Sequence, residues 1–497
     1  KGAVNASGTS SSGEAGDFTF TADRLSISDG SRIGAATAGK GNGANITIKE
    51  SSLVELAGST SVIDDNGTEV PIPSGIFANS QGSGKAGNID VDTEKLIVRD
   101  GAVLSTQVSN TSEEVGGNLA VSGNILEVTG GGQLRTTTEG KGDAGNITLD
   151  VTDQITLEGN ESGLFANTDL GSEGKGGNIL TGKTTEQNDG STLITPQTVK
   201  TVAIRNGAKI GVDSEGKGEG GEVEIQAGSL TLDNKAAISA ETTSNTGGDI
   251  NLKVQDVLLM RNQSNISTTA GTNEQPGDGG NITISSGFLV TVPNENSDIT
   301  ANAFEGSGGK INIASERIFW MEPRNREELV EFNGSSVELD PSLLLTNDIT
   351  AFSQQNPDLD GLITIDLLNT VDPSRGLTPL PTAFVDPSEL IDQTCTLSST
   401  KSSSQFVNTG RGGVPQSPSN PLFPDATVRR LAKPIARRSQ SRSPRSLAPS
   451  PDNKYSESIV EAQGWVKLRN GKIRLVAQAP SVTPQGNWQT TTGCYVR

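Results

Sequence analysis

The chain has 497 residues, with 60 Gly, 3% aromatic residues and no His. Globular cores usually take bulk from aromatic residues and Met, so this one has to be built from Ile, Val and Leu, which favour strands. Lack of His excludes His-dependent triads and zinc sites with His ligands. The formal net charge is −20 although residues 398–497 hold 15 Lys or Arg against 4 Asp or Glu. The acidic remainder is typical of a soluble rod that does not bind nucleic acid.

An octet recurs along the first two thirds of the chain, as GNGANITI (41–48), GDAGNITL (142–149) and GDGGNITI (277–284). Its Asn, or a substitute for it, returns about every 30 residues, and two intervals are longer. The clearest copies of the marker are Asn45, Asn88, Asn146, Asn178 and Asn281. This period predicts a solenoid, with insertions in the two long intervals.

One unit, residues 145–176, shows how each repeat folds. GNITLDV and QITLEGN alternate apolar and polar residues, and SGLFANT predicts a third short strand. Ile147, Leu149 and Val151 fall on one face, which a single unit cannot bury. Units stacked in register at about 4.8 Å per turn bury it against each other. The sequence therefore predicts an all-β parallel β-helix.

The octet predicts one corner of this helix and the start of a strand. Gly allows positive φ in a tight turn, and Asn can occupy a left-handed position and bond to its own backbone. Repeated at one corner, the Asn side chains are expected to form a ladder along the rod. Asn45, Asn88, Asn146, Asn178 and Asn281 are accordingly interpreted as structural corner residues.

The pattern predicts four regions. Residues 1–315 are β-helix repeats, 316–397 are closing coils and a cap, with a short helix in 316–332, and 398–456 are a disordered Ser/Pro/Arg-rich linker. Residues 457–497 are a small β module with a hairpin turn at Asn470–Gly471. Cys395 and Cys494 are candidates for a disulfide closing about 100 residues, which requires an oxidising compartment; free thiols are the open alternative.

The sequence predicts no catalytic, cofactor or metal residues, and no stretch long enough for a membrane span. The Gly-rich octets resemble a calcium-binding nonapeptide repeat, but single copies about 30 residues apart favour structural corners and leave only weak calcium binding open. Polysaccharide-processing enzymes also use β-helices. Here the carboxylates are scattered and a Gly-His-Gly motif cannot exist, so we expect no enzyme. Such an enzyme, or a surface-layer component, remains the alternative.

The repeat GGNITI…LxLxxGAxIS across residues 15–315 is followed by two characteristic C-terminal segments. DPSELIDQTC (386–395) precedes the linker, and EAQGWVKLRNGKIRLVA (461–477) follows it. Together they resemble filamentous haemagglutinin-like exoproteins of two-partner secretion, particularly the large cyanobacterial members. The resemblance implies a right-handed β-helix, exported through an outer-membrane transporter partner. It also implies an adhesin, secreted or displayed at the cell surface, that contacts surface or matrix glycans or proteins. The family's N-terminal secretion domain is not in this sequence, which starts in mid-repeat at Lys1.

Overall fold

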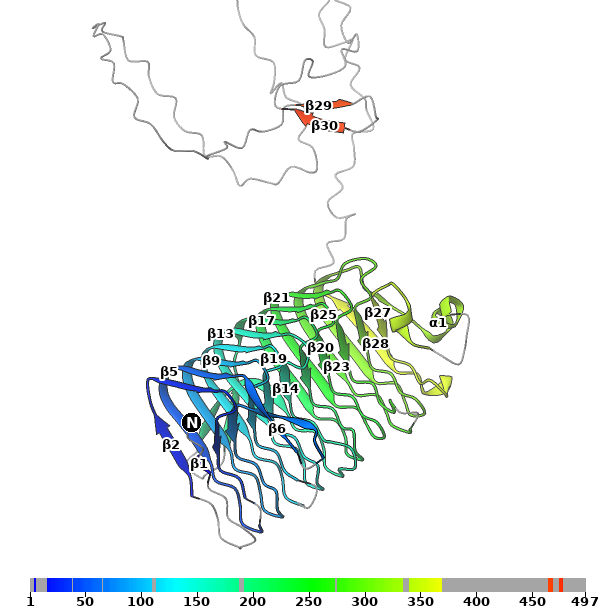
Figure 1. Ribbon diagram of the computed structural model, residues 1–497. Helices are drawn as coiled ribbons and strands as arrows, with labels where there is room; N and C mark the ends of the chain where they lie inside the picture. The colour runs from blue at the N-terminus through cyan, green and yellow to red at the C-terminus, as the bar shows by residue number, and fades with distance from the viewer. Residues whose placement is uncertain are drawn as a thin grey trace, which may run out of the picture. The chain divides into compact units, whose positions relative to one another are not determined.

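The computed structural model describes residues 4–5, 16–368 apart from 38, 65, 110–112, 187–191, 273–274 and 334–338, and the strands 464–467 and 473–476. The chain divides into two compact units, Lys1–Val385 and Asp386–Arg497. The first unit is a parallel β-helix of about 10 turns, as Figure 1 shows. The predicted fold class is therefore confirmed.

Two parallel sheets run the length of this unit. The long-strand sheet contains β2 (Phe18–Thr21), β3 (Arg24–Ser28), β5 (Ile46–Ala57), β9 (Ile89–Arg99), β11 (Leu119–Thr129), β13 (Ile147–Glu158), β15 (Ile179–Glu186), β16 (Thr192–Pro196), β17 (Val199–Arg205), β19 (Glu222–Asp233), β21 (Asp249–Arg261), β23 (Ile282–Val290), β25 (Lys310–Phe319) and β28 (Leu362–Leu367). The short-strand sheet contains β1 (Val4–Asn5), β4 (Arg32–Gly34), β8 (Gly75–Phe77), β10 (Val103–Ser105), β12 (Gln133–Arg135), β14 (Gly163–Phe165), β18 (Lys209–Gly211), β20 (Ala237–Ser239), β22 (Asn265–Ser267), β24 (Asp298–Thr300), β26 (Glu322–Pro323) and β27 (Asp348–Thr350). A line of single parallel bridges from Thr37 to Ser353 follows the short strands.

The expectation of three strands per turn was wrong in one respect. GNITLDV and QITLEGN are not separate strands but the two halves of β13. Its pairing with β11 shifts register after Gly123, where a bulge absorbs the extra residue. The chain stays extended through the bulge, so the apolar alternation resumes on the same face. The third segment, SGLFANT, contains the three-residue strand β14 at the predicted place.

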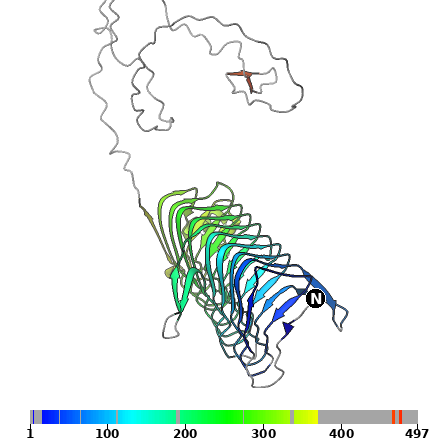
Figure 2. The ribbon, with the colours of Figure 1, turned by 90° about the vertical axis from the view of Figure 1, so that its left-hand side faces the viewer.

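The core is an aliphatic stack shared by all turns. Ile147, Leu149, Val151, Ile155 and Leu157 are each at most 1% exposed. The strand-starting aliphatics Ile46 and Ile89 pair directly on successive turns, and the same register continues to β28. Figure 2 shows the turns stacked one on another. Each turn therefore buries its apolar face only because its neighbours cover it.

The insertions predicted for the two long repeat intervals are both hairpins. The first hairpin, β6 (Ser59–Ile63) with β7 (Glu69–Pro73), leaves the corner between β5 and β8. The second, β15 with β16, splits a long strand, so that β17 rather than β15 pairs with the second half of β13. Both hairpins are antiparallel and leave the parallel register of the rod unchanged.

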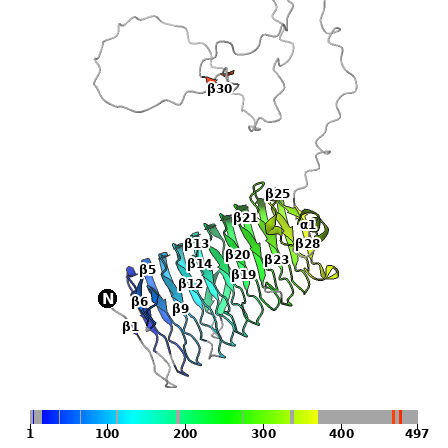
Figure 3. The same ribbon diagram turned by 45° about the vertical axis from the view of Figure 1, so that its right-hand side comes forward.

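The last turns carry an insertion that contains helix α1 (Arg326–Asn333) and the 3₁₀ helix at Pro341–Leu343; a second 3₁₀ helix spans Pro357–Leu359. Helix α1 overlaps the segment predicted to hold a helix, residues 316–332, and Figure 3 shows it at the end of the rod where the last turns lie. Leu329, Leu339 and Phe352 form a small core of their own under the insertion. The insertion thus packs on the rod through a separate apolar cluster.

The second unit is described only for β29 (Gly464–Lys467) and β30 (Ile473–Val476), which pair antiparallel. This pairing agrees with the predicted hairpin, although its Asn470–Gly471 turn lies outside the described residues. The predicted linker, 398–456, and both cysteines, Cys395 and Cys494, also lie outside them.

Candidate functional site: a cleft on the short-strand sheet

The predicted corner residues lie in one column along the rod. The backbone N–H of Asn88 donates to Oδ1 of Asn45 at 2.9 Å, and Asn178 donates to Asn146 in the same way at 2.8 Å. Asn281 donates to Oδ1 of Asp249, which holds the position one turn earlier, at 3.0 Å. Each side chain therefore binds the backbone of the next turn, which makes the corner a hydrogen-bonded ladder.

The octet glycines have a different role from the one expected. None of those in the column that precedes the ladder has positive φ. A Cβ on Gly145 would lie 1.9 Å from the Gly117 carbonyl oxygen, and one on Gly177 would lie 1.9 Å from that of Gly145. From Gly87 onward glycine is thus required because successive backbones approach too closely for a Cβ, whereas Ala44 holds the position one turn earlier. The same contact recurs up to Gly361, where it is 2.0 Å.

Positive φ occurs instead at the other corner, between the long and short strands. Asp100 and Gly101 have φ of 57° and 77°, and Asn206 and Gly207 have 58° and 82°. Two consecutive residues of this kind make a type I′ turn, which Asp-Gly and Asn-Gly favour. Turn chemistry and close approach are therefore divided between two corners.

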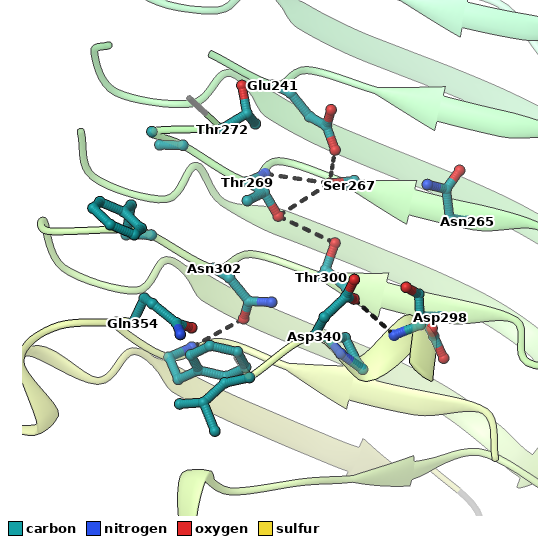
Figure 4. A pocket seen from close by; sticks show the side chains of 18 of the residues that line it. Glu241, Asn265, Ser267, Thr269, Thr272, Asp298, Thr300, Asn302, Asp340 and Gln354 are labelled. Atoms are coloured by element: carbon teal, nitrogen blue, oxygen red, sulfur yellow. Dashed lines mark hydrogen bonds between the residues drawn. The ribbon is translucent and has the colours of Figure 1, made fainter. Parts of the chain in front are cut away.

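A cleft of about 750 Å³ lies on the outer face of the short-strand sheet, near the C-terminal end of the rod. Its floor comes from β22, β24 and the residues that follow them, and its wall from residues 339–342 of the insertion. Glu241, which follows β20, extends the lining by one more turn (Figure 4). No Lys or Arg is among the described lining residues.

Polar contacts fix the wall against the floor. Nδ2 of Asn296 donates to the carbonyl oxygen of Ser342 at 2.6 Å, and the N–H of Ser297 donates to Oδ1 of Asn347 at 2.9 Å. Arg324, at the start of the insertion, pairs with the fully buried Asp348 at 2.9 Å. The cleft is therefore preformed rather than made by a loose loop.

Hydroxyl groups cover the floor, as Figure 4 shows. Ser267 donates to the Glu241 carboxylate, and Thr269 Oγ1 donates to Oγ1 of Thr300 on the next turn at 3.3 Å. Oδ1 of Asn302 accepts the backbone N–H of Phe352 at 3.1 Å. Hydroxyls both donate and accept hydrogen bonds, so this floor can bind a ligand rich in either group.

Three carboxyl groups, those of Glu241, Asp298 and Asp340, line the cleft. Burial raises the pKa of Glu241, and the nearby Asp213 raises it further. Burial also raises the pKa of Asp298 to about 7, and the carboxylates of Asp348 and Asp340 add to this. Asp298 therefore carries less negative charge near neutral pH than an ordinary carboxylate.

Each carboxylate also has a structural partner. Oδ1 of Asp298 accepts the backbone N–H of Asp348 on the next turn at 2.8 Å, and Oδ1 of Asp340 accepts that of Ser342 at 2.9 Å. Glu241 accepts the Ser267 hydroxyl one turn on. Asp298 and Glu241 therefore link neighbouring turns, whereas Asp340 caps the 3₁₀ helix at Pro341–Leu343.

The sequence showed scattered carboxylates, and the fold places three of them, from different segments of the chain, along this one cleft. Its acidic residues are 57 and 42 positions apart in the chain and belong to different turns. Only the repeat register combined with the position of the insertion brings them together. The register alone would have placed Glu241 and Asp298 on the same outer face.

No protein-family model matches this chain, and no curated protein or solved structure does. Among the described residues, no helix is long and apolar enough to cross a membrane. The part of the chain that the structure describes also contains no group of three or more Cys, Asp or Glu arranged to hold a metal ion. The interpretation of the cleft thus depends on its geometry and chemistry.

Proposed function

We propose that this chain is the rod of an adhesin-like exoprotein, displayed at the cell surface or secreted through an outer-membrane transporter partner. The observation that carries the proposal is the uninterrupted stack of about 10 turns with one common core. The Asn ladder and the close-packed glycine column restrain most turns against the next. A stiff rod with a repeating surface suits display and many weak, simultaneous contacts with surface or matrix glycans or proteins.

Surface display is tested on the organism that carries the gene. Antibodies against the purified chain should label intact cells or detect the protein in the culture medium. Labelling only after permeabilisation would contradict display. Adhesion is tested with beads coated at graded densities of the protein. Multivalent contact predicts a steep dependence of bead retention on coating density, whereas retention proportional to density would argue for independent single contacts.

A polysaccharide-processing enzyme is the second candidate, because Glu241 and Asp298 line one cleft and burial raises the pKa of both. A carboxyl group that stays protonated near neutral pH can act as a general acid. We favour the non-catalytic role because both carboxylates already accept structural hydrogen bonds. Release of reducing sugar by the purified chain, abolished by Asp298→Asn and Glu241→Gln, would reverse this preference.

A further inference from the structure

The proposed display function does not specify what the cleft binds, but the size and chemistry of its lining do. Its lining comes from four successive turns, since Glu241, β22, β24 and Phe352 each belong to a different turn. Turns lie about 4.8 Å apart, so the lining extends roughly 15 Å along the rod. This length fits a short chain of linked units better than one small molecule.

The lining combines polar groups with apolar surface. Ser267, Thr269 and Thr300 offer hydroxyls from two neighbouring turns, while Phe304 and Pro341 contribute apolar faces. Oδ1 of Asn296, also in the lining, is buried and accepts no hydrogen bond within the described structure. Sugar rings carry hydroxyls that donate and accept, together with apolar C–H faces, and so match both parts.

The acidic lining disfavours an anionic ligand. Glu241, Asp298 and Asp340 repel carboxylated, sulfated or phosphorylated chains, and no described cation in the lining compensates them. A cationic chain is disfavoured because each carboxylate already accepts a hydrogen bond and two of the three have raised pKa values. The remaining choice is an uncharged, hydroxyl-rich chain.

We infer that the cleft between the short-strand sheet and residues 339–342 binds a segment of a neutral glycan. The inference deepens the proposed function by assigning a ligand class to one site on the rod. The site requires no bond breaking, because its carboxylates act as hydrogen-bond partners. Sugar hydroxyls would bind along the β22–β24 floor, and ring faces would pack on Phe304.

The test uses a blocking substitution at an exposed position. Asn265, at the start of β22, is exposed and lines the cleft, so Asn265→Trp fills the space without altering the core. Gln133 holds the same register position four turns earlier, outside the cleft. Gln133→Trp is therefore the matched control.

Titration calorimetry on the full chain at pH 7 compares the hexaoses of cellulose, laminarin and starch with polygalacturonate and a chitosan oligomer. We expect at least one neutral hexaose to bind. Asn265→Trp should weaken it about tenfold or more, equivalent to about 1.4 kcal/mol, and Gln133→Trp should leave it unchanged. Binding of only the charged chains, equal effects of both variants, or no binding of any hexaose would overturn the inference. Surface labelling of cells is unaffected by these outcomes, so the proposed function is tested separately.

Discussion

The backbone N–H of Asn146 donates to Oδ1 of Asn118, one turn earlier, at 2.9 Å. Asn146 in turn accepts the N–H of Asn178 through its own Oδ1 at 2.8 Å. Within the described rod, seven turns have such a side-chain acceptor, whereas the backbone N–H groups of Asp249 and Leu362 donate instead to the carbonyl oxygens of Gly221 and Gly309. Asp17 and Asp249 take the same role at other turns, so the ladder bond depends on an acceptor oxygen rather than on Asn itself.

Substitutions at Asn146 should distinguish the effect of the acceptor oxygen from that of the rest of the side chain. Asn146→Ala leaves the Asn178 N–H without its partner, which should lower the free energy of unfolding by about 1–2 kcal/mol. Asn146→Asp keeps the oxygen and should stay within about 0.5 kcal/mol of the parent, as Asp249 shows it can. Urea denaturation followed by circular dichroism gives both values. Equal losses in the two variants would contradict the ladder.

From Gly87 onward the glycine column should tolerate no side chain. Gly145→Ala places a Cβ 1.9 Å from the Gly117 carbonyl oxygen, so the two turns must separate. We expect a loss of about 3 kcal/mol or more, because rigid backbone lies on both sides. Gly16→Ala is the control, since a Cβ there meets no atom of the described chain within 4 Å. A fall in the melting temperature for Gly145→Ala alone is the expected result.

The sequence predicted the register of the rod because the marker residue and the inward aliphatics repeat together. Asn45 aligns with Asn88, Asn146 with Asn178, and so on to Lys310, as the strand pairings show. The reason for the octet glycines was predicted wrongly, as positive φ in a tight turn. Close approach between turns is a property of the stack and cannot be read from one repeat. The cleft escaped prediction for a similar reason: its wall, residues 339–342, belongs to an insertion outside the repeat.

The β6–β7 hairpin should be dispensable for folding. It joins Ala57 to Ser74, whereas the next turn spans the same corner with Asp100–Gly101. Replacing residues 58–73 by Asp-Gly removes the exposed side chains of Val62 and Ile63, which are 48% and 77% accessible. The replacement also removes the hydrogen bond from Arg32 Nε to the Pro73 carbonyl oxygen. The free energy of unfolding should therefore fall by no more than about 1 kcal/mol. Thermal melting checks this.

Deleting Asp100–Gly101 from the uninterrupted corner is the comparison for that variant. These two residues hold the left-handed conformation that turns β9 into β10, with φ of 57° and 77°. Without them the chain cannot reach the short-strand sheet in register. This deletion should disrupt folding, so that thermal melting shows no cooperative transition. If the hairpin deletion also abolished the transition, β6 and β7 would be shown to stabilise the rod.

The buried carboxyl of Asp298 should make the rod less stable as the pH rises. Its pKa increases from 3.8 to about 7 on folding, so between these values the folded state binds more protons than the unfolded state. The free energy of unfolding then decreases from pH 4 to pH 7, by at most about 4 kcal/mol for a shift of this size. Asp298→Asn retains the oxygen that accepts the Asp348 N–H and carries no charge. This variant should be more stable than the parent at pH 8 and show a shallower pH dependence.

Asp249→Asn isolates this effect from the general consequences of removing a carboxylate. Asp249 is exposed and accepts the N–H of Asn281 at 3.0 Å, so it performs the same structural task in water. Its substitution removes one ladder carboxylate outside the cleft, and the slope of stability against pH in this variant is the baseline for the Asp298→Asn slope. Glu241, whose pKa burial also raises, stays in both variants and contributes equally. The slope is measured by urea denaturation at pH 4, 5.5, 7 and 8. The difference in slope between the parent and Asp298→Asn therefore reports the Asp298 carboxyl. A difference of zero would mean that the fold does not desolvate this group.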